Sequence, residues 1–143
     1  MIHMAVPDDL PAIFALVDTY CEDMDIDRVI TKNSLREMLY VKGVLLVEYN
    51  GDLIGGIAGY TLPGMFNRDL FFSVMFFYII KDYRFLTKSI IKELELVLLT
   101  TPVTKICFGV LGSNTAKKMQ RFYRMMGYSE LETHMVKDIK YAN

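Results

Sequence analysis

The chain has 143 residues, which suffices for one average domain with a single hydrophobic core. Hydrophobic residues make up 52% of it and charged residues 23%, a balance that excludes an intrinsically disordered protein. The 16 Lys and Arg residues nearly match the 17 Asp and Glu residues, so we do not expect a basic nucleic-acid-binding domain.

The two cysteines and the apolar runs limit the setting of the protein. Cys21 and Cys107 are too few for a disulfide scaffold and have no close metal-ligating partners, which favours a reducing, cytoplasmic setting without a metal site. The first ten residues lack the charged and apolar regions of a signal peptide. The longest apolar run, residues 70–80, is about half as long as the ~20 residues of a membrane-spanning helix, so we expect no membrane partner.

Charge is distributed unevenly along the chain. Residues 1–70 carry 5 basic and 11 acidic side chains, whereas residues 71–143 carry 11 basic and 6 acidic ones. If both halves build one domain, it has an acidic and a basic side, which suits a ligand with one anionic and one cationic end. The alternative is an ordinary solvated surface.

Local patterns predict the elements of the first third of the chain. Residues 2–5 indicate a short strand, and Pro7 with the two acids after it begins a helix that runs to about Tyr20. A second helix follows, capped by Thr31 or Ser34. Between the two helices we expect an acidic loop with four carboxylates: Glu22, Asp23, Asp25 and Asp27.

The middle of the chain is rich in strand-forming residues. Residues 44–49 and 53–62 indicate two strands joined by a tight turn at Asn50-Gly51, a pair that accepts positive φ. The glycines of the second strand mark a bulge or a close backbone approach: Gly55, Gly56 and Gly59. Residues 70–80 have the aromatic and β-branched composition of a strand buried on both faces.

The last third alternates between helical and strand patterns. We predict a helix over 86–99, a strand over 103–110, and a helix that starts at Gly112–Asn114 and ends before Gly127 as its C′ residue. Residues 128–139 indicate one or two further strands.

This order of elements predicts the fold class. We expect an α+β (mixed α/β) single domain over residues 1–143, with about six or seven strands in one central mixed sheet and about four helices around it. Its parallel part is predicted between residues 70–80 and 103–110.

Two short motifs carry a resemblance to a known family. In residues 77–89, Arg84, Thr87 and Ser89 fall on the spaced positions of an R/Q-x-x-G-x-G/A loop. The second motif, FYRMMGY over residues 122–128, matches L-Y-x-x-x-G-F. With the element order, these motifs resemble the GNAT superfamily of acetyl-CoA-dependent N-acetyltransferases over nearly the whole chain. The sequence looks most like the short members of this superfamily that bacteriophage genomes encode. Residues 132–139 also resemble the last strand of those members.

The resemblance implies acetyl-CoA as co-substrate, with no metal. The strand backbone at Phe77, Tyr78 and Ile79 would align the pantetheine arm. Backbone N–H groups at the start of the following helix would hold the pyrophosphate, where the helix dipole favours an anion. The residues of this segment are Arg84, Phe85, Leu86, Thr87, Lys88, Ser89 and Ile90. Because no glycine occurs between Gly64 and Gly109, the alternative stays open that the segment is only a helix start.

Acyl transfer to an amine needs a base, an oxyanion donor and an acid for the leaving thiolate. The resemblance makes Tyr123 the candidate acid, and an ordinary phenol holds its proton at neutral pH. The alternative is that Tyr123 packs like its neighbour Phe122. The glutamate that often serves as base in the family is absent, and the candidate substitutes are Glu22, Asp25 and His134.

Several charged or polar side chains allow two interpretations. Basic residues at helical spacing fit either the phosphates of coenzyme A or solvated helix faces: Lys88, Lys92, Lys117, Arg121 and Arg124. Asn114 suits a helix cap or a cofactor contact. The acids of residues 22–27 favour a cationic acceptor such as a polyamine, an aminoglycoside or a lysine-rich peptide, or they are solvated.

The leading hypothesis is therefore an N-acetyltransferase that moves an acetyl group from acetyl-CoA to a primary amine by direct attack. The alternatives on the same fold are a catalytically degenerate binding or assembly protein of the kind that phages encode, or an inhibitor of a host protein. A phage-encoded protein would work in the host cytoplasm. A homodimer or a protein partner stays open.

Overall fold

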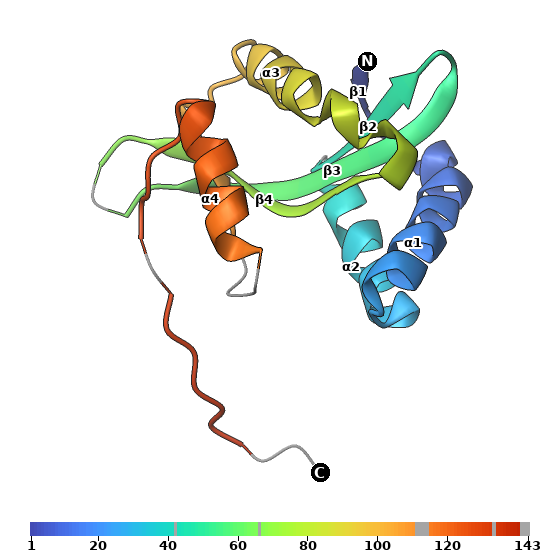
Figure 1. Cartoon of the computed structure of the whole chain (residues 1–143), viewed down its shortest axis with the longest axis horizontal. Coiled ribbons are helices and arrows are strands. Elements are labelled where there is room, and N and C mark those ends of the chain that lie inside the picture. Colours follow the sequence, from blue (N-terminus) through green and yellow to red (C-terminus); the bar gives the residue numbers. More distant parts are fainter. Residues whose placement is uncertain (42, 66, 111–114, 133, 141–143) are drawn as a thin grey trace. The chain divides into compact units, whose positions relative to one another are not determined.

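A five-stranded sheet with helices on both faces forms the larger part of the chain (Figure 1). The structure, a computed structural model, describes residues 1–41, 43–65, 67–110, 115–132 and 134–140. Contacts within the chain divide it into two compact units, residues 1–109 and 110–143. The sheet belongs to the first unit, and each unit is described by itself.

The strands lie in the sheet in the order in which they occur along the chain. They are β1 Ile2–Met4, β2 Val44–Tyr49, β3 Asp52–Pro63, β4 Leu70–Ile79 and β5 Lys105–Phe108. Neighbouring strands are antiparallel except β4 and β5, which are parallel. The predicted parallel pair is thus confirmed.

The helices follow the predicted order. They are α1 Leu10–Met24, α2 Arg28–Tyr40, α3 Thr87–Leu98 and, in the second unit, α4 Ala116–Met125. Short 3₁₀ helices, Pro7–Asp9 and Lys81–Leu86, lead into α1 and α3. None of the described helices is both long and apolar enough to cross a membrane.

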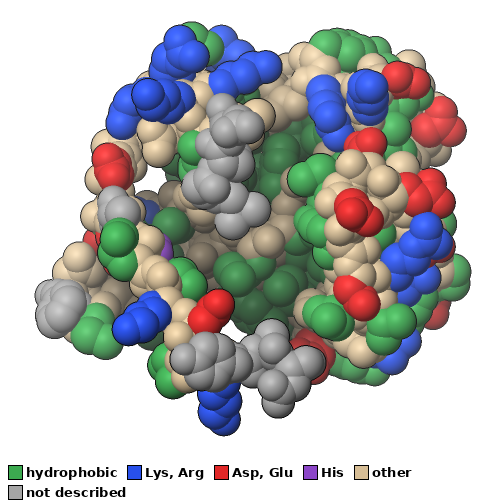
Figure 2. Space-filling model, turned by 60° about the horizontal axis from the view of Figure 1, so that its bottom comes forward, with side chains coloured by type: hydrophobic (Ala, Val, Ile, Leu, Met, Phe, Trp, Pro, Cys, Tyr) green, Lys and Arg blue, Asp and Glu red, His purple; other side chains and the backbone are tan. Residues whose placement is uncertain are grey.

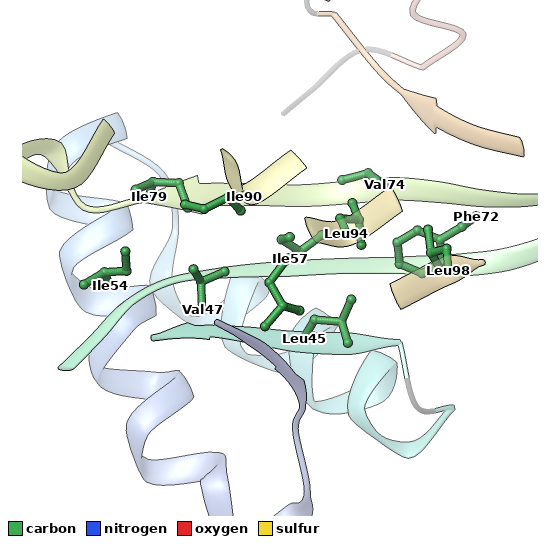
Figure 3. Packing of buried hydrophobic residues seen from close by; sticks show 11 residues of the cluster. Leu45, Val47, Ile54, Ile57, Phe72, Val74, Ile79, Ile90, Leu94 and Leu98 are labelled. Carbon is green, nitrogen blue, oxygen red and sulfur yellow. The ribbon is translucent and has the colours of Figure 1, made fainter. Parts of the chain in front are cut away.

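Alternation along the strands builds a core on each face of the sheet. In β2, Leu45 and Val47 face one core while Val44 and Leu46 face the other, as the two-residue period of a strand requires. Figure 3 shows the first core, in which α3 packs on the sheet through Ile90, Leu94 and Leu98. The second core joins the sheet to α1 and α2 through Ile13, Val17, Leu35, Met38 and Leu39.

The turn between β2 and β3 is formed as predicted. Asn50 and Gly51 have φ values of 51° and 84°, so both central residues of the turn adopt the left-handed region. Asn tolerates this region and Gly has no Cβ to oppose it, which explains why this dipeptide sets the hairpin.

β4 contains a β-bulge at Met75. The pairing between β3 and β4 passes from Ala58 opposite Phe76 to Gly59 opposite Val74, so Met75 has no partner on β3. Such an extra residue bends a strand and reverses the faces of the residues beyond it. The prediction of a bulge or close approach at the β3 glycines is confirmed, because a Cβ on Gly59 would overlap the Ser73 backbone oxygen.

The cap of α2 differs from the prediction. The side chain of Asp27 accepts a hydrogen bond from the Ile30 N–H at 2.9 Å, so the predicted caps, Thr31 and Ser34, are wrong. Both lie within the helix. A carboxylate accepts from the free N–H groups of a first turn, and Asp27 is the acid placed directly before it.

The acidic segment is more helical and less open than predicted. α1 continues past Tyr20 to Met24, and Glu22 and Asp23 lie in its last turn. Glu22 pairs with Arg28 at 3.2 Å. Figure 2 shows acidic and basic side chains interspersed over the α1 and α2 side of the molecule. Nearby basic side chains therefore compensate part of the negative charge of the acidic segment.

The second unit contains α4 and the chain that follows it. Gly127 has φ 91°, its N–H donates to the Arg124 carbonyl, and the N–H of Tyr128 donates to the Tyr123 carbonyl. These two bonds satisfy carbonyls at the end of α4 in a Schellman motif, which confirms Gly127 as the C′ residue.

The strands predicted over residues 128–139 are wrong, since no strand forms among the described residues of that stretch. Met135, Val136 and Ile139 have 90%, 90% and 94% of their surface exposed. The described sheet therefore has five strands, not the six or seven predicted. A strand-like composition indicates that a segment suits a pleated surface, and it does not supply the partner that a strand needs.

Candidate functional site

β4 extends beyond its parallel partner. β5 pairs with β4 only over residues 71–74, whereas β3 pairs with β4 as far as Ile79. The rings of Phe77 and Phe108 meet edge to face at 5.8 Å near the end of β5. Beyond the bulge, no described strand lies along the β5 side of residues 75–79, which leaves an unpaired backbone edge.

The hydrogen-bond pattern shows which backbone groups face this edge. The Ile80 N–H donates to the Ile54 carbonyl of β3 at 2.8 Å. In an antiparallel pair, the N–H and C=O of one residue point to the same side, and successive residues alternate. Tyr78 therefore also faces β3, whereas the backbone groups of Phe77 and Ile79 face the unpaired edge.

Arg84 links the end of β4 to α1. Its Nε donates to the Ile79 carbonyl at 3.1 Å, which agrees with a carbonyl that faces away from β3. Its Nη2 donates to Asp23 Oδ2 at 2.8 Å, and the Tyr78 hydroxyl donates to the same oxygen at 2.9 Å. We call these three residues, Asp23, Tyr78 and Arg84, the Asp23 cluster.

Aromatic rings adjoin the Asp23 cluster. Tyr20 lies edge to face against Phe76 at 4.8 Å and against Tyr78 at 5.2 Å, measured between ring centroids. Burial raises the pKa of Tyr20. Burial, together with the carboxylate of Asp23, also raises the pKa of Tyr78. Both phenols therefore keep their protons at neutral pH and act as donors rather than bases.

The segment predicted to hold pyrophosphate is helical. Residues 84–90 span the end of the 3₁₀ helix and the first turn of α3, and none of them has a positive φ. The N–H of Thr87 donates to the Arg84 carbonyl, and so does its hydroxyl, at 2.7 Å. Because the backbone is helical here, Thr87 and Ser89 occur without strain at positions where the family has glycines.

The side chains of this segment point in different directions. Phe85 is 72% exposed, whereas Leu86 packs against the core beneath α3 and Ile90 is buried in that core. Lys88 and Ser89 are exposed on the first turn of α3. Their predicted contact with phosphate stays a prediction.

Tyr123 lies in the second unit, on α4. Its ring contacts Phe122 at 5.7 Å and Tyr128 at 5.8 Å. Burial raises its pKa, so Tyr123 is protonated at neutral pH. The acid and the packing interpretations both require this form, and the acid role stays a prediction.

Each predicted substitute for a base has its own local surroundings. Glu22 pairs with Arg28, Asp25 ends α1 with a left-handed φ of 53°, and exposed His134 contacts Glu132 at 2.9 Å. Asn114, predicted as a cap or a cofactor contact, lies outside the described residues.

The sequence predicts Asp23 only as one of four loop acids that favour a cationic acceptor or are solvated, and it does not predict the bonds of Asp23 to Tyr78 and Arg84. Asp23 follows Tyr20 by three residues, and this spacing puts both side chains on one face of α1. The spacing can be seen in the sequence, but it has this meaning only if the helix continues past Tyr20, as it does in the structure.

Comparisons with known proteins show the fold. No protein-family profile and no curated protein matches the sequence. A possible acetyltransferase from Clostridium difficile 630 aligns over 99% of this chain and 98% of its own, with a TM-score of 0.78 and 14% identity. A ribosomal-protein-alanine N-acetyltransferase from Brucella melitensis biovar Abortus 2308 aligns over 98% and 99%, with a TM-score of 0.75 and 15% identity.

An aminoglycoside acetyltransferase from an uncultured soil metagenomic sample aligns over 98% of both chains, with a TM-score of 0.73 and 16% identity. These similarities extend along the whole chain. The protein therefore has the α+β fold of the GNAT acetyltransferases.

Proposed function

We propose that the protein is an N-acetyltransferase that transfers the acetyl group of acetyl-CoA to a primary amine. The observation that carries this proposal is the unpaired edge of β4 beyond the bulge at Met75. The fold shared with acetyltransferases supports it. A neutral amine attacks the thioester carbonyl of acetyl-CoA directly, so that the C–N bond forms and the C–S bond breaks. Coenzyme A leaves as the thiolate, and the amine gives up its proton to water.

The β4 edge suits the pantetheine arm of coenzyme A, which contains amide groups. Amides pair with backbone groups as an added strand pairs with a sheet edge. The N–H and C=O of Phe77 and the N–H of Ile79 face that edge, while the Ile79 carbonyl is held by Arg84. The edge thus offers both a donor and an acceptor.

The chain also supplies groups for the chemical step. A backbone N–H at the β4 edge would donate to the thioester oxygen and stabilise the negative charge that develops there. Tyr123, which burial keeps protonated by raising its pKa, would donate its proton to the leaving thiolate. The exposed Lys88 would attract the phosphates of coenzyme A.

A second candidate is a binding or assembly protein on the same fold that has lost catalysis. The helical backbone at residues 84–90 favours it, because the Thr87 N–H is already bonded to the Arg84 carbonyl. A phosphate cradle depends on N–H groups that are free to bind a ligand. The two candidates differ in whether the protein binds and consumes acetyl-CoA.

Calorimetry with acetyl-CoA, followed by thiol release in the presence of a panel of primary amines, separates these candidates. The acetyltransferase should bind acetyl-CoA with a dissociation constant below about 1 mM, within the usual range for enzyme substrates. An absence of binding at millimolar acetyl-CoA would reject this function and leave the binding protein.

Tyr123→Phe is expected to lower turnover about 100-fold and to leave the affinity for acetyl-CoA unchanged, because only the proton donor is lost. The measurement compares kcat with the calorimetric dissociation constant. Tyr40→Phe, at an exposed tyrosine of α2, is the matched control and should change neither. Wild-type turnover in Tyr123→Phe would reject the acid role.

A further inference from the structure

All hydrogen bonds that the described residues donate to the Asp23 carboxylate go to one of its two oxygens. Tyr78 and Arg84 both donate to Oδ2, at 2.9 and 2.8 Å. Among residues 1–41, 43–65, 67–110, 115–132 and 134–140, no donor is bonded to Oδ1. The side chain is 35% exposed. Asp23 is therefore fixed through one oxygen and open to solvent through the other.

The surroundings of Asp23 favour a cation. Asp23 lies in the last turn of α1, where the carbonyl end of the helix dipole is negative. The Tyr78 hydroxyl is bonded to Asp23, the ring of Tyr20 packs against Tyr78, and aromatic faces attract cations. The Arg84 guanidinium, 5.8 Å from the centroid of Tyr78, shows that this ring already accepts one.

We propose that Asp23 binds the ammonium group of the acceptor amine through Oδ1, while the half-buried ring of Tyr20 contacts the adjacent carbon chain. Tyr78 and Arg84 are positioning residues that hold the carboxylate in place. This inference rests on the proposed function and names its substrate class: primary alkylamines that are cationic at neutral pH. A neutral acceptor gains only a weaker hydrogen bond from Oδ1, and an anionic acceptor is repelled by the carboxylate.

The expected affinity is modest. Arg84 already compensates the charge of Asp23, so the ammonium gains a charge-assisted hydrogen bond and ring contacts rather than an unopposed ion pair. We therefore expect a small alkylammonium ion to bind in the millimolar range. A longer or polycationic amine would bind more tightly through further contacts.

The test is an NMR titration of the full chain with n-butylammonium chloride at constant chloride concentration. The ring signals of Tyr20 and Tyr78 should shift and saturate. The neutral n-butanol, of similar size, should shift them less at every concentration. Equal shifts with n-butanol would show a purely apolar contact and would overturn the proposal without any variant.

Asp23→Asn removes the charge and still accepts a hydrogen bond from Tyr78. It should weaken the binding of n-butylammonium about tenfold, the loss expected for one charge-assisted hydrogen bond. Asp8→Asn is the matched control, because Asp8 is exposed ahead of the first turn of α1, whereas Asp23 lies in the last turn of that helix. It should change the affinity less than twofold, and a thermal melt shows that each variant is folded.

Unchanged affinity in Asp23→Asn would overturn the proposal. The calorimetric titration with acetyl-CoA remains a separate measurement on the same protein. If n-butylammonium binds at Asp23 but acetyl-CoA does not bind, the acetyltransferase proposal fails and the amine site stands. If acetyl-CoA binds and is consumed but Asp23→Asn acts like wild type, only the amine site fails.

Discussion

Leu94→Ala is expected to lower the free energy of unfolding by about 2–5 kcal/mol, the range for removing a buried leucine side chain. Leu94 is fully buried between α3 and the sheet, where Figure 3 shows it among the side chains of the first core. Its loss removes apolar contacts and leaves a void that the strands cannot close. Urea denaturation followed by circular dichroism measures the difference.

Leu96→Ala on the same helix is the matched control. Leu96 is 64% exposed, so the same change in chemistry should alter the free energy of unfolding by less than about 0.5 kcal/mol. Equal losses in the two variants would contradict the packing of α3 through Ile90, Leu94 and Leu98.

Gly59→Ala is expected to destabilise the protein by about 1–3 kcal/mol or more, the range for inserting atoms into a packed interior. The new Cβ would overlap the backbone oxygen of Ser73, which cannot rotate away as a side chain can. Since Gly59 pairs with Val74 beside the bulge, β3 and β4 must separate there. We expect a lower midpoint in urea and a weaker affinity for acetyl-CoA.

Gly109→Ala controls for the general effect of replacing glycine. A Cβ at Gly109 would have no atom within 4 Å, so this variant should keep the stability of the wild type. If Gly59→Ala proved as stable as Gly109→Ala, the close approach of β3 and β4 at the bulge would be wrong.

The sequence predicted the features that depend on local residue chemistry. Asn50-Gly51 and Gly127 supply positive φ where a turn and a helix end require it, and both were found. The order of elements from β1 to α4 and the parallel pairing of β4 with β5 also followed from the sequence, because helix and strand periods differ clearly.

The bulge shows what a single strand cannot reveal. Residues 70–80 are apolar on both faces, so no change in alternation marks Met75 as unpaired. The glycines of β3 gave an indirect signal, because Gly59 lets the Ser73 backbone approach. The position of the bulge, and with it the unpaired edge of β4, depends on the register between two strands.

The Asp23 cluster depends on contacts between distant segments. Asp23, Tyr78 and Arg84 come from α1, β4 and the 3₁₀ helix, and no local pattern joins them. Helical periodicity predicts an end of α1 near Tyr20, which places Asp23 in a loop. The family motif predicts a phosphate-binding role for Arg84, whereas the described partners of Arg84 are the Ile79 carbonyl and Asp23.

The most direct test of the β4 edge is amide hydrogen exchange, measured by NMR with and without saturating acetyl-CoA. The amides of Phe76 and Tyr78 face β3 and should be protected in both states. The amides of Phe77 and Ile79 should exchange rapidly in the free protein and become protected when acetyl-CoA binds. Binding of acetyl-CoA without any added protection at Phe77 and Ile79 would contradict the proposed role of this edge.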